Sequence, residues 1–338
     1  MMSALLRGNG LVKNIIFDAA SSNNRDNCFD PYVLLKKTFK SAGIQIDTSD
    51  MGVTKTPFFE LHQDVQFETC VDRNYLLMFE TEFVKPENKN LKEQARYRKI
   101  FTWNDSLVDG EYFVKLNFPN PVAAHEPDGF RARDRFCCLI ASNRTLSSKD
   151  ERILYPKRVE AIRWFEKNAP QDFDLFGVDW EMPVLHSGFV GRLERKLWPA
   201  ISSLKKPTPF CSYRGKLKHK RDALCRTRFS ICYENVADLP GYITEKIFDC
   251  FFSGCVPVYW GASNITTYIP PDCFIDRRAF RDMTSVYDYL KKITEEQFIG
   301  YQTSIAKFLR SGAAGPFTAE FFAETVVTTI VRDLELGA

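Results

Sequence analysis

Residues 234–249, ENVADLPGYITEKIFD, place asparagine, tyrosine, glutamate and lysine in a turn between an apolar strand and a helix. The strand is predicted over 229–233, and apolar residues then recur at helical spacing from Ile247 until Gly254 provides a stop. Open α/β sheets bind ligands where the carboxyl end of a strand meets the amino end of a helix. This turn is therefore predicted to be a binding site.

The start of that helix suits an anion. Its free N–H groups and partial positive charge favour a phosphate, and Lys246 adds a full positive charge in the first turn. Because a lysine there opposes the helix dipole, it needs a nearby anion or free exposure to solvent. Tyr242 can stack or donate, Glu245 can accept from paired ribose hydroxyls, and Asn235 offers both a donor and an acceptor. The alternative is that Glu245 and Lys246 are solvated residues of a first turn.

The segment 229–261, FSICYENVADLPGYITEKIFDCFFSGCVPVYWG, resembles the signature of the α-1,3/4-fucosyltransferase family, glycosyltransferase family ten. That family has a Phe-Glu-Asn run, then Tyr-x-Thr-Glu-Lys, then a Gly-x-Val-Pro-Val-x-x-Gly strand. Tyr233 stands where the family often has Phe, and the spacer after Asn235 departs from the family's length. Neither departure removes a functional group. The resemblance implies a GDP-fucose donor bound by Asn235, Tyr242, Glu245 and Lys246.

A second cation is expected, because two phosphates need more positive charge than one lysine and one helix end provide. Residues 139–167, LIASNRTLSSKDERILYPKRVEAIRWFEK, read as a strand, a polar loop and a helix near whose start Arg158 lies. The resembling family has Ser-Asn after this strand and a pyrophosphate-binding arginine at the head of the helix, so the resemblance gives that role to Arg158. Its rivals are Arg144, Arg152 and Lys157, and the alternative for Arg158 is a surface helix residue.

A carboxylate base is expected in the first half of the chain. Sugar transfer to a hydroxyl with inversion needs one carboxylate that takes the proton of the incoming O–H group. In NYLLMFETEFVKPE an apolar strand runs into Glu80 and Glu82. The family's base lies in a Phe-Glu-Ser-Pro or Gly-Glu-Asn-Glu-Ser-Pro stretch, which Phe79, Glu80 and Pro86 match with extra residues before the proline. The resemblance implies Glu80 as the base, Glu82 is the second candidate, and two solvated carboxylates are the alternative.

An acceptor-binding stretch is expected close to the base. Residues 99–119, KIFTWNDSLVDGEYFVKLNFP, resemble the family's Asn-Trp-(Thr/Ser) stretch. By this resemblance Trp103 stacks on a sugar face, and Asn104 or Asp105 binds hydroxyl groups. The alternative for Trp103 is a core position.

Apolar strand-like runs alternate with helical patterns, which predicts α/β units with parallel sheets. The first series is expected to begin at 12–18, VKNIIFD, and the second at 135, RFCCLIASN. The resemblance implies the GT-B fold, with two Rossmann-like domains facing across a cleft. The expected ranges are 1–134 for an N-terminal acceptor domain, 135–315 for a C-terminal nucleotide-sugar domain, and 316–338 for a C-terminal helix that packs back across the domains.

Charge and cysteine usage narrow the function class. The net charge of +3 comes from 46 basic and 43 acidic residues, so no global field favours nucleic acid. The ten cysteines contain no C-x-x-C pair and form no metal-like cluster with the four histidines, which favours reduced thiols and a cytoplasmic location. Neither a signal peptide nor a membrane span is predicted. The basic run 213–222, YRGKLKHKRD, could contact anionic lipid at a membrane surface or a lipopolysaccharide acceptor. A solvated helical face is the favoured interpretation of this run.

Asp172 and Asp174 have the spacing of carboxylates that hold Mn²⁺ against a diphosphate in another glycosyltransferase class. They lead into a predicted strand, so the expected scheme is metal-free and has no cofactor besides the GDP-fucose donor. Three hypotheses follow: a fucosyltransferase acting on a glycan, a transferase of the same fold that uses another nucleotide sugar, and a glycan- or nucleotide-binding module without turnover. The sequence does not specify the acceptor glycan, the linkage or the oligomeric state.

Overall fold

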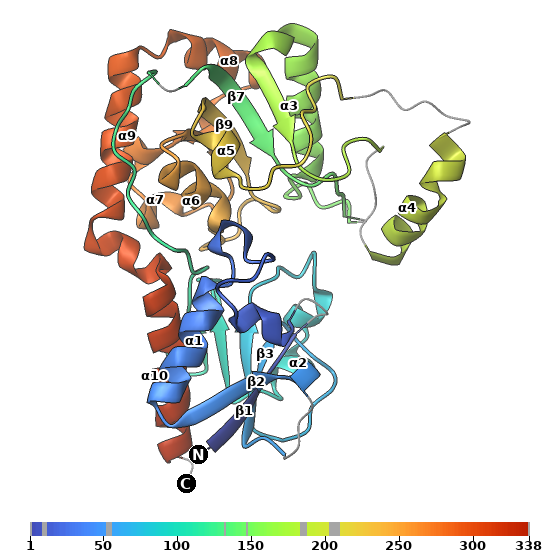
Figure 1. Cartoon of the computed structure of the whole chain (residues 1–338), viewed down its shortest axis with the longest axis vertical. Coiled ribbons are helices and arrows are strands. Elements are labelled where there is room, and N and C mark those ends of the chain that lie inside the picture. Colours follow the sequence, from blue (N-terminus) through green and yellow to red (C-terminus); the bar gives the residue numbers. More distant parts are fainter. Residues whose placement is uncertain are drawn as a thin grey trace. The chain divides into compact units, whose positions relative to one another are not determined.

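Figure 1 shows the computed structural model of the chain, which describes residues 2–8, 12–51, 56–131, 133–146, 148–182, 188–202 and 210–336. The chain clusters into two compact units. Unit 1 comprises Met1–Val122, Pro240–Glu245 and Gly312–Ala338, and unit 2 comprises Ala123–Leu239 and Lys246–Ser311. Each unit carries its own parallel sheet, as the alternating sequence pattern predicts.

Unit 1 is built on a six-stranded parallel sheet with the order β2-β1-β3-β4-β5-β6. The strands are β1 (Met2–Arg7), β2 (Ile44–Thr48), β3 (Phe59–Gln63), β4 (Asn74–Met78), β5 (Lys99–Thr102) and β6 (Phe113–Lys115). The helices are α1 (Asp30–Ser41), α2 (Leu91–Gln94) and α10 (Ala319–Leu336), with short 3-10 turns at η1 (Asn14–Phe17), η2 (Arg25–Asn27), η3 (Ser49–Met51), η4 (Pro86–Lys89) and η8 (Gly312–Phe317).

The first strand lies earlier than the sequence predicts. β1 pairs with β2 on one side and β3 on the other, so this short apolar run is an interior strand of the sheet and Leu6 is fully buried. The segment 12–18 instead contains the 3-10 turn η1, which buries Ile16. The prediction of a first strand at 12–18 is therefore wrong, and β3 was not predicted.

One face of the unit 1 sheet is covered by α1 and α10, which lie side by side (Figure 1). Phe39 of α1 and Ile330 of α10 are fully buried in their shared core. A polar clamp fixes the far end of α10, because Tyr75 Oη and Arg98 Nε each donate to Asp333 Oδ2 at 2.6 Å. The C-terminal helix thus packs within unit 1.

Unit 2 has a five-stranded parallel sheet with the order β11-β10-β9-β7-β8. The strands are β7 (Arg135–Ile140), β8 (Phe173–Phe176), β9 (Thr227–Tyr233), β10 (Val256–Trp260) and β11 (Ile275–Asp276). The helices are α3 (Tyr155–Asn168), α4 (Gly188–Ser202), α5 (Arg221–Leu224), α6 (Glu245–Phe252), α7 (Ile265–Tyr268), α8 (Met283–Lys292) and α9 (Glu295–Leu309), with 3-10 turns η5 (Pro170–Asp172), η6 (Pro271–Cys273) and η7 (Arg277–Ala279).

The strand order of unit 2 reverses between β7 and β9. The chain leaves β7 for β8 on one side and leaves β9 for β10 on the other, and two such diverging connections form a topological switch point. The carboxyl ends of β7 and β9 are therefore where a ligand site is expected.

The division into units differs from the predicted ranges 1–134, 135–315 and 316–338. Residues 123–134 cluster with unit 2, where the buried Arg133 donates to the main-chain oxygens of Leu224, Thr227 and Ser253 at 2.8–3.0 Å. Residues 240–245 cluster with unit 1 although the chain on both sides of them belongs to unit 2. These contacts are long-range, so they leave no local signal in the sequence.

In the described part of the chain, no helix combines the length and the apolar character that crossing a membrane requires.

Candidate functional site at the end of strand β9

Two loops meet at the switch point of unit 2. The loop that leads into α3 is bonded to the turn after β9: Leu154 N donates to Asn235 O at 3.0 Å, and Ala237 N donates to Arg152 O at 2.7 Å. Ile153 and Val236 form an antiparallel bridge between these contacts. The start of α3 is thus fixed against the turn that carries the resemblance.

Arg158, the fourth residue of α3, uses this junction. Its side chain is buried, and its Nη2 donates to Tyr233 O at 2.6 Å and to Asn235 Oδ1 at 3.0 Å. The guanidinium also lies over the Tyr155 ring, 4.9 Å from the ring centre. The structure therefore brings Arg158 and Asn235 together at the end of β9.

Lys246 lies in the first turn of α6, as the sequence predicts. Its Nζ lies 3.1 Å from Glu234 Oε2, and the Glu234 side chain is fully buried. The Glu234 carboxylate thus lies beside the lysine, for which the sequence analysis expected a nearby anion or free exposure to solvent. The signal was present, since Glu234 directly precedes Asn235, but only the asparagine was assigned.

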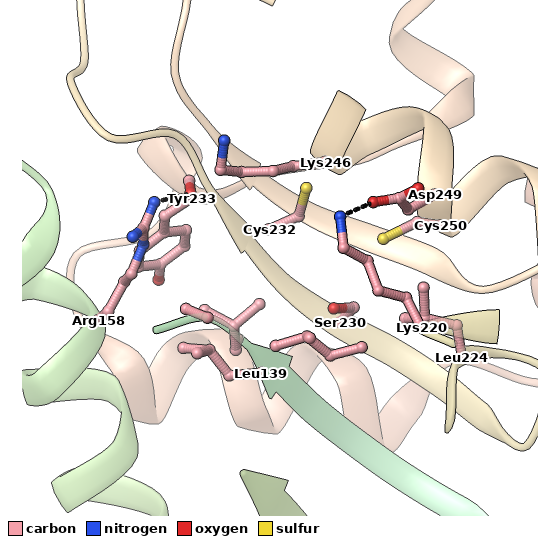
Figure 2. Close-up of a pocket in the computed structure, with 13 residues that line it drawn as sticks. Leu139, Arg158, Lys220, Leu224, Ser230, Cys232, Tyr233, Lys246, Asp249 and Cys250 are labelled. Carbon is pink, nitrogen blue, oxygen red and sulfur yellow. Dashed lines mark hydrogen bonds and ion pairs between the residues drawn. The ribbon is translucent and has the colours of Figure 1, made fainter. Parts of the chain in front are cut away.

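Arg158 and Lys246 line the same cavity, which has a volume of about 40 Å³ (Figure 2). Figure 2 shows both cationic groups beside Tyr233, at the end of the strand. The other lining residues are Leu139, Ile140, Ala141, Lys220, Leu224, Ser230, Ile231, Cys232, Tyr233, Asp249 and Cys250. A cavity of this size holds a few waters or one small anionic group. It therefore matches part of a nucleotide sugar rather than the whole ligand.

Two of the lining residues form an ion pair that the sequence analysis did not anticipate. Lys220 Nζ lies 2.5 Å from Asp249 Oδ2. Lys220 comes from the basic run 213–222, in which Lys216 and Lys218 are exposed. Burial raises the pKa of the Cys232 thiol, so this sulfur forms a neutral part of the wall. Lys220 thus adds a third cationic group to the lining.

The rival cations near α3 lie elsewhere. Arg152 Nη2 pairs with Asp150 Oδ2 at 2.8 Å, Lys157 Nζ pairs with a Glu160 oxygen at 2.9 Å, and Arg144 is exposed. Of the four candidates, Arg158 is the one that lines the cavity.

Tyr242 and Glu245 cluster with unit 1 rather than with this cavity. Tyr242 is 2% exposed, and its ring lies 4.7 Å from the Trp103 ring and 5.9 Å from the Phe118 ring. The ring predicted to stack on or donate to the nucleotide is used for packing in this structure. Glu245 is exposed at the start of α6, and its ribose contact stays a prediction.

Trp103 occupies the core position that the sequence analysis left open as its alternative. It is 2% exposed, and its Nε1 donates to Phe79 O at 2.8 Å. This buried ring offers little face for sugar stacking. Asn104 is half-buried and its Oδ1 accepts from Ser106 N at 3.0 Å, so its contact with an acceptor stays a prediction.

Glu80 and Glu82 both follow β4 at the carboxyl edge of the unit 1 sheet, and both are half-buried. The main chain of Glu80 is firmly held, since its N–H donates to the buried Asp64 carboxylate at 2.9 Å. The choice of Glu80 over Glu82 as the base stays a prediction.

Asp172 and Asp174 have separate partners. Asp172 Oδ2 accepts from Tyr287 Oη at 2.6 Å, whereas Asp174 Oδ1 accepts from Arg214 Nε at 2.7 Å. Among the described residues no group of three or more histidine, cysteine or acidic side chains is arranged to hold a metal ion. These two carboxylates therefore serve as partners for a tyrosine and an arginine.

Comparison with known proteins supports the family resemblance. Residues 208–303 match the family model described as glycosyltransferase family 10 (fucosyltransferase), C-terminal part. The resemblance read from the sequence is thereby confirmed. The matched segment contains Lys220, Lys246 and Asp249, which are three of the four charged residues that line the cavity.

Among curated relatives, the α-(1,3)-fucosyltransferase FucT of Helicobacter pylori is 31% identical over 103 residues. The aligned part covers 29% of this chain and 21% of that enzyme, so the match spans about a fifth of the relative's length. The family-10 similarity is therefore strong but local.

Solved structures match along the whole chain. An α-1,3-fucosyltransferase with GDP has a TM-score of 0.55 at 13% identity and covers 98% of this chain and 91% of its own. An α-glucosyltransferase in complex with UDP and DNA has a TM-score of 0.56 at 9% identity and covers 98% of this chain and 100% of its own. The fold is therefore that of the GT-B glycosyltransferases, as the family-10 resemblance implies.

Proposed function

We propose that this protein is a glycosyltransferase that moves L-fucose from GDP-fucose to a hydroxyl group of a glycan acceptor, with inversion at the anomeric carbon. The observation that carries the proposal is that Arg158 and Lys246 line one cavity, in a chain whose residues 208–303 match family 10. Two cations that converge at a strand end and helix start suit the pyrophosphate of a nucleotide sugar.

The cations act on the departing GDP. As the C–O bond to the phosphate breaks, negative charge grows on the leaving pyrophosphate, and Arg158, Lys246 and the start of α6 stabilise it. The guanidinium is already fixed by its bonds to Tyr233 O and Asn235 Oδ1, so little reorganisation is needed when charge develops. Lys246 exchanges part of its contact with Glu234 for phosphate. These groups supply the charge that a metal ion supplies in other glycosyltransferases.

Glu80 acts on the other substrate. Its carboxylate accepts the proton of the acceptor O–H group while that oxygen forms the new bond to the anomeric carbon. The sugar thus passes to the acceptor in one displacement, and GDP leaves with the electron pair of the broken bond. Holding donor and acceptor in this geometry contributes much of the remaining acceleration.

A donor screen on a glycan array tests the proposal, with released GDP or UDP as the readout. We expect turnover with GDP-fucose and slower or no turnover with GDP-mannose and UDP-glucose. Binding of GDP without release from any donor on any glycan would support a binding module instead.

The second candidate is a transferase of the same fold with another nucleotide sugar as donor. It is favoured by the UDP-bound α-glucosyltransferase, whose TM-score equals that of the fucosyltransferase within 0.01. Fold does not fix the sugar. The same screen separates the two, because this candidate predicts UDP or GDP release with a donor other than GDP-fucose.

A further inference from the structure

The two residues that follow β4, Phe79 and Glu80, have their main chain held by side chains from outside their strand. Phe79 N and Glu80 N both donate to Asp64 Oδ1 at 2.9 Å. Phe79 O accepts from Trp103 Nε1, and Glu80 O accepts from Asn88 Nδ2, each at 2.8 Å. Three side chains therefore satisfy all four main-chain polar groups of this dipeptide.

Asp64 is the centre of this arrangement. It follows β3, it is 1% exposed, and its φ of 54° lies in the left-handed region. Its Oδ1 accepts a third bond, from Asn88 Nδ2 at 2.8 Å, so Asn88 links the carboxylate to Glu80 O. Asn88 is itself fixed, since its Oδ1 accepts from Val65 N at 3.0 Å.

This arrangement costs the folded protein free energy. A buried carboxylate loses its hydration, and a non-glycine residue with positive φ adds backbone strain. Burial raises the pKa of the Asp64 carboxyl, which the N–H donors of Glu80, Asn88 and Phe79 partly offset. A strand end in contact with water needs no such device, because water can satisfy its main-chain groups.

These hydrogen bonds fix the main-chain position from which the Glu80 side chain extends. A general base works only when it is held within about 0.5 Å of its productive position by groups that are themselves locked. We infer that Asp64, assisted by Asn88, is a positioning residue that locks the main chain of Glu80 so that its carboxylate meets the acceptor hydroxyl. This inference rests on the proposed function for the role of Glu80, but not for the locking itself.

The locking is tested without activity, by hydrogen exchange and mass spectrometry on peptides that cover residues 79–82. In Asp64→Ala we expect exchange of the Phe79 and Glu80 amides to accelerate at least tenfold. The matched control is Glu60→Ala, which removes another buried carboxylate of the β3 region that is bonded to Arg7 and His62 instead. Unchanged protection in Asp64→Ala, or equal loss in both variants, overturns the inference whatever the activity.

The positioning role is tested by a double-mutant cycle on transfer. We expect Asp64→Ala to lower kcat about 100-fold with the KM for the donor unchanged, as for a displacement of about 1 Å. Asp64→Asn, which keeps an acceptor oxygen and tolerates positive φ, should recover most of this loss. In the Glu80→Gln background the Asp64→Ala change should have no further effect, whereas an equal loss there contradicts positioning through Glu80.

Two further outcomes are informative. If Asp64→Ala does not fold, Asn88→Ala removes the contact to Glu80 O and should accelerate exchange at residues 79–82 in the same way. If the wild-type protein transfers no sugar from any donor, the proposed function fails, and the exchange experiment still decides whether Asp64 locks this segment.

Discussion

The strand ends that carry the proposed chemistry in the two units are held in different ways. At the end of β9 in unit 2, Lys246 pairs with the buried carboxylate of Glu234, and Arg158 donates to Tyr233 O and Asn235 Oδ1. At the end of β4 in unit 1, the side chains of Asp64, Asn88 and Trp103 hold the main chain. The ion pair of Lys246 and Glu234 can exchange partners when a phosphate binds, whereas side-chain hydrogen bonds hold all four main-chain polar groups of Phe79 and Glu80. Under the proposed function, the comparison indicates an adaptable contact, that of Lys246, at the donor site and a rigid support for the base.

The largest expected effect is a loss of kcat when Glu80, at the end of β4, is changed. Glu80→Gln should lower kcat by about 1000-fold, since general base catalysis contributes roughly 10²–10⁴-fold. GDP affinity, measured by titration calorimetry, should stay within twofold of wild type because the cavity of Arg158 and Lys246 is unchanged. Glu82→Gln is the matched control. If Glu82→Gln shows the large loss and Glu80→Gln does not, the base is Glu82.

The next largest expected effect is a loss of GDP affinity when Lys246, near the end of β9, is changed. Lys246→Ala should weaken GDP binding by about 2 kcal/mol, or roughly 30-fold, since it removes a charged contact and leaves Glu234 buried without this cation. The control is Lys157→Ala, which removes a surface lysine of the same unit that pairs with Glu160. Equal affinities of the two variants for GDP would remove Lys246 from the donor site.

A conservative change at the second cation tests whether geometry or charge matters. Arg158→Lys keeps the charge but cannot reproduce the planar contacts to Tyr233 O and Asn235 Oδ1. We expect GDP affinity to fall about tenfold, as for the loss of one charged hydrogen bond. A GDP titration measures it, with thermal unfolding as the check that the variant is folded. Full affinity in Arg158→Lys would mean that charge alone suffices.

A stability effect confined to unit 1 comes from the clamp on α10. Burial raises the pKa of the Asp333 carboxyl, but hydrogen bonds from Arg98 and Tyr75 outweigh it and leave that pKa below its usual value. A lowered pKa contributes stability above the unfolded-state pKa, which is lost as pH falls through the folded value. Asp333→Asn should therefore lower the free energy of unfolding at pH 7 by about 1 kcal/mol, with less difference below about pH 4.

Urea unfolding at pH 7 and pH 3.5 measures this effect, and the exposed Glu320 of the same helix provides the control, Glu320→Gln. GDP affinity should be unchanged in both variants. A stability loss that is independent of pH would show that the Asp333 charge is not responsible.

The smallest expected effect is that of a chelator. Because Arg158, Lys246 and the α6 start supply the positive charge in the proposed scheme, EDTA should leave the transfer rate within 20% of its untreated value, a threshold of about 0.1 kcal/mol. Loss of activity that Mn²⁺ restores would contradict the metal-free scheme.

In the proposed donor site, the position of Lys246 was predictable because its signals are local. A helical period that begins at Ile247 and ends at Gly254 places Lys246 in a first turn, and α6 confirms it. The pairing of Lys246 with Glu234 was not recognised, although the two residues belong to one quoted segment. Arg158 depended on the family resemblance, because helical spacing alone does not separate it from Lys157.

The contacts that support Glu80, the proposed base, could not be predicted from the sequence. Asp64 lies 16 residues before Glu80 in the chain and 24 residues before Asn88. Its role depends on its positive φ and on the hydrogen bond from the Asn88 amide. Neither property follows from periodicity or composition. Similarly, the interior position of β1 in the sheet depends on pairing with β2 and β3, which a short apolar run at the start of the chain does not reveal.

The chain passes between the two units after residues 122, 239, 245 and 311. Recombination with a relative by a single crossover within residues 123–311 would therefore give a hybrid in which neither unit comes wholly from one parent. A chimaera meant to exchange the whole of unit 1 must instead replace Met1–Val122, Pro240–Glu245 and Gly312–Ala338 together. The four crossings of the chain between the units therefore limit which segments can be exchanged with a relative.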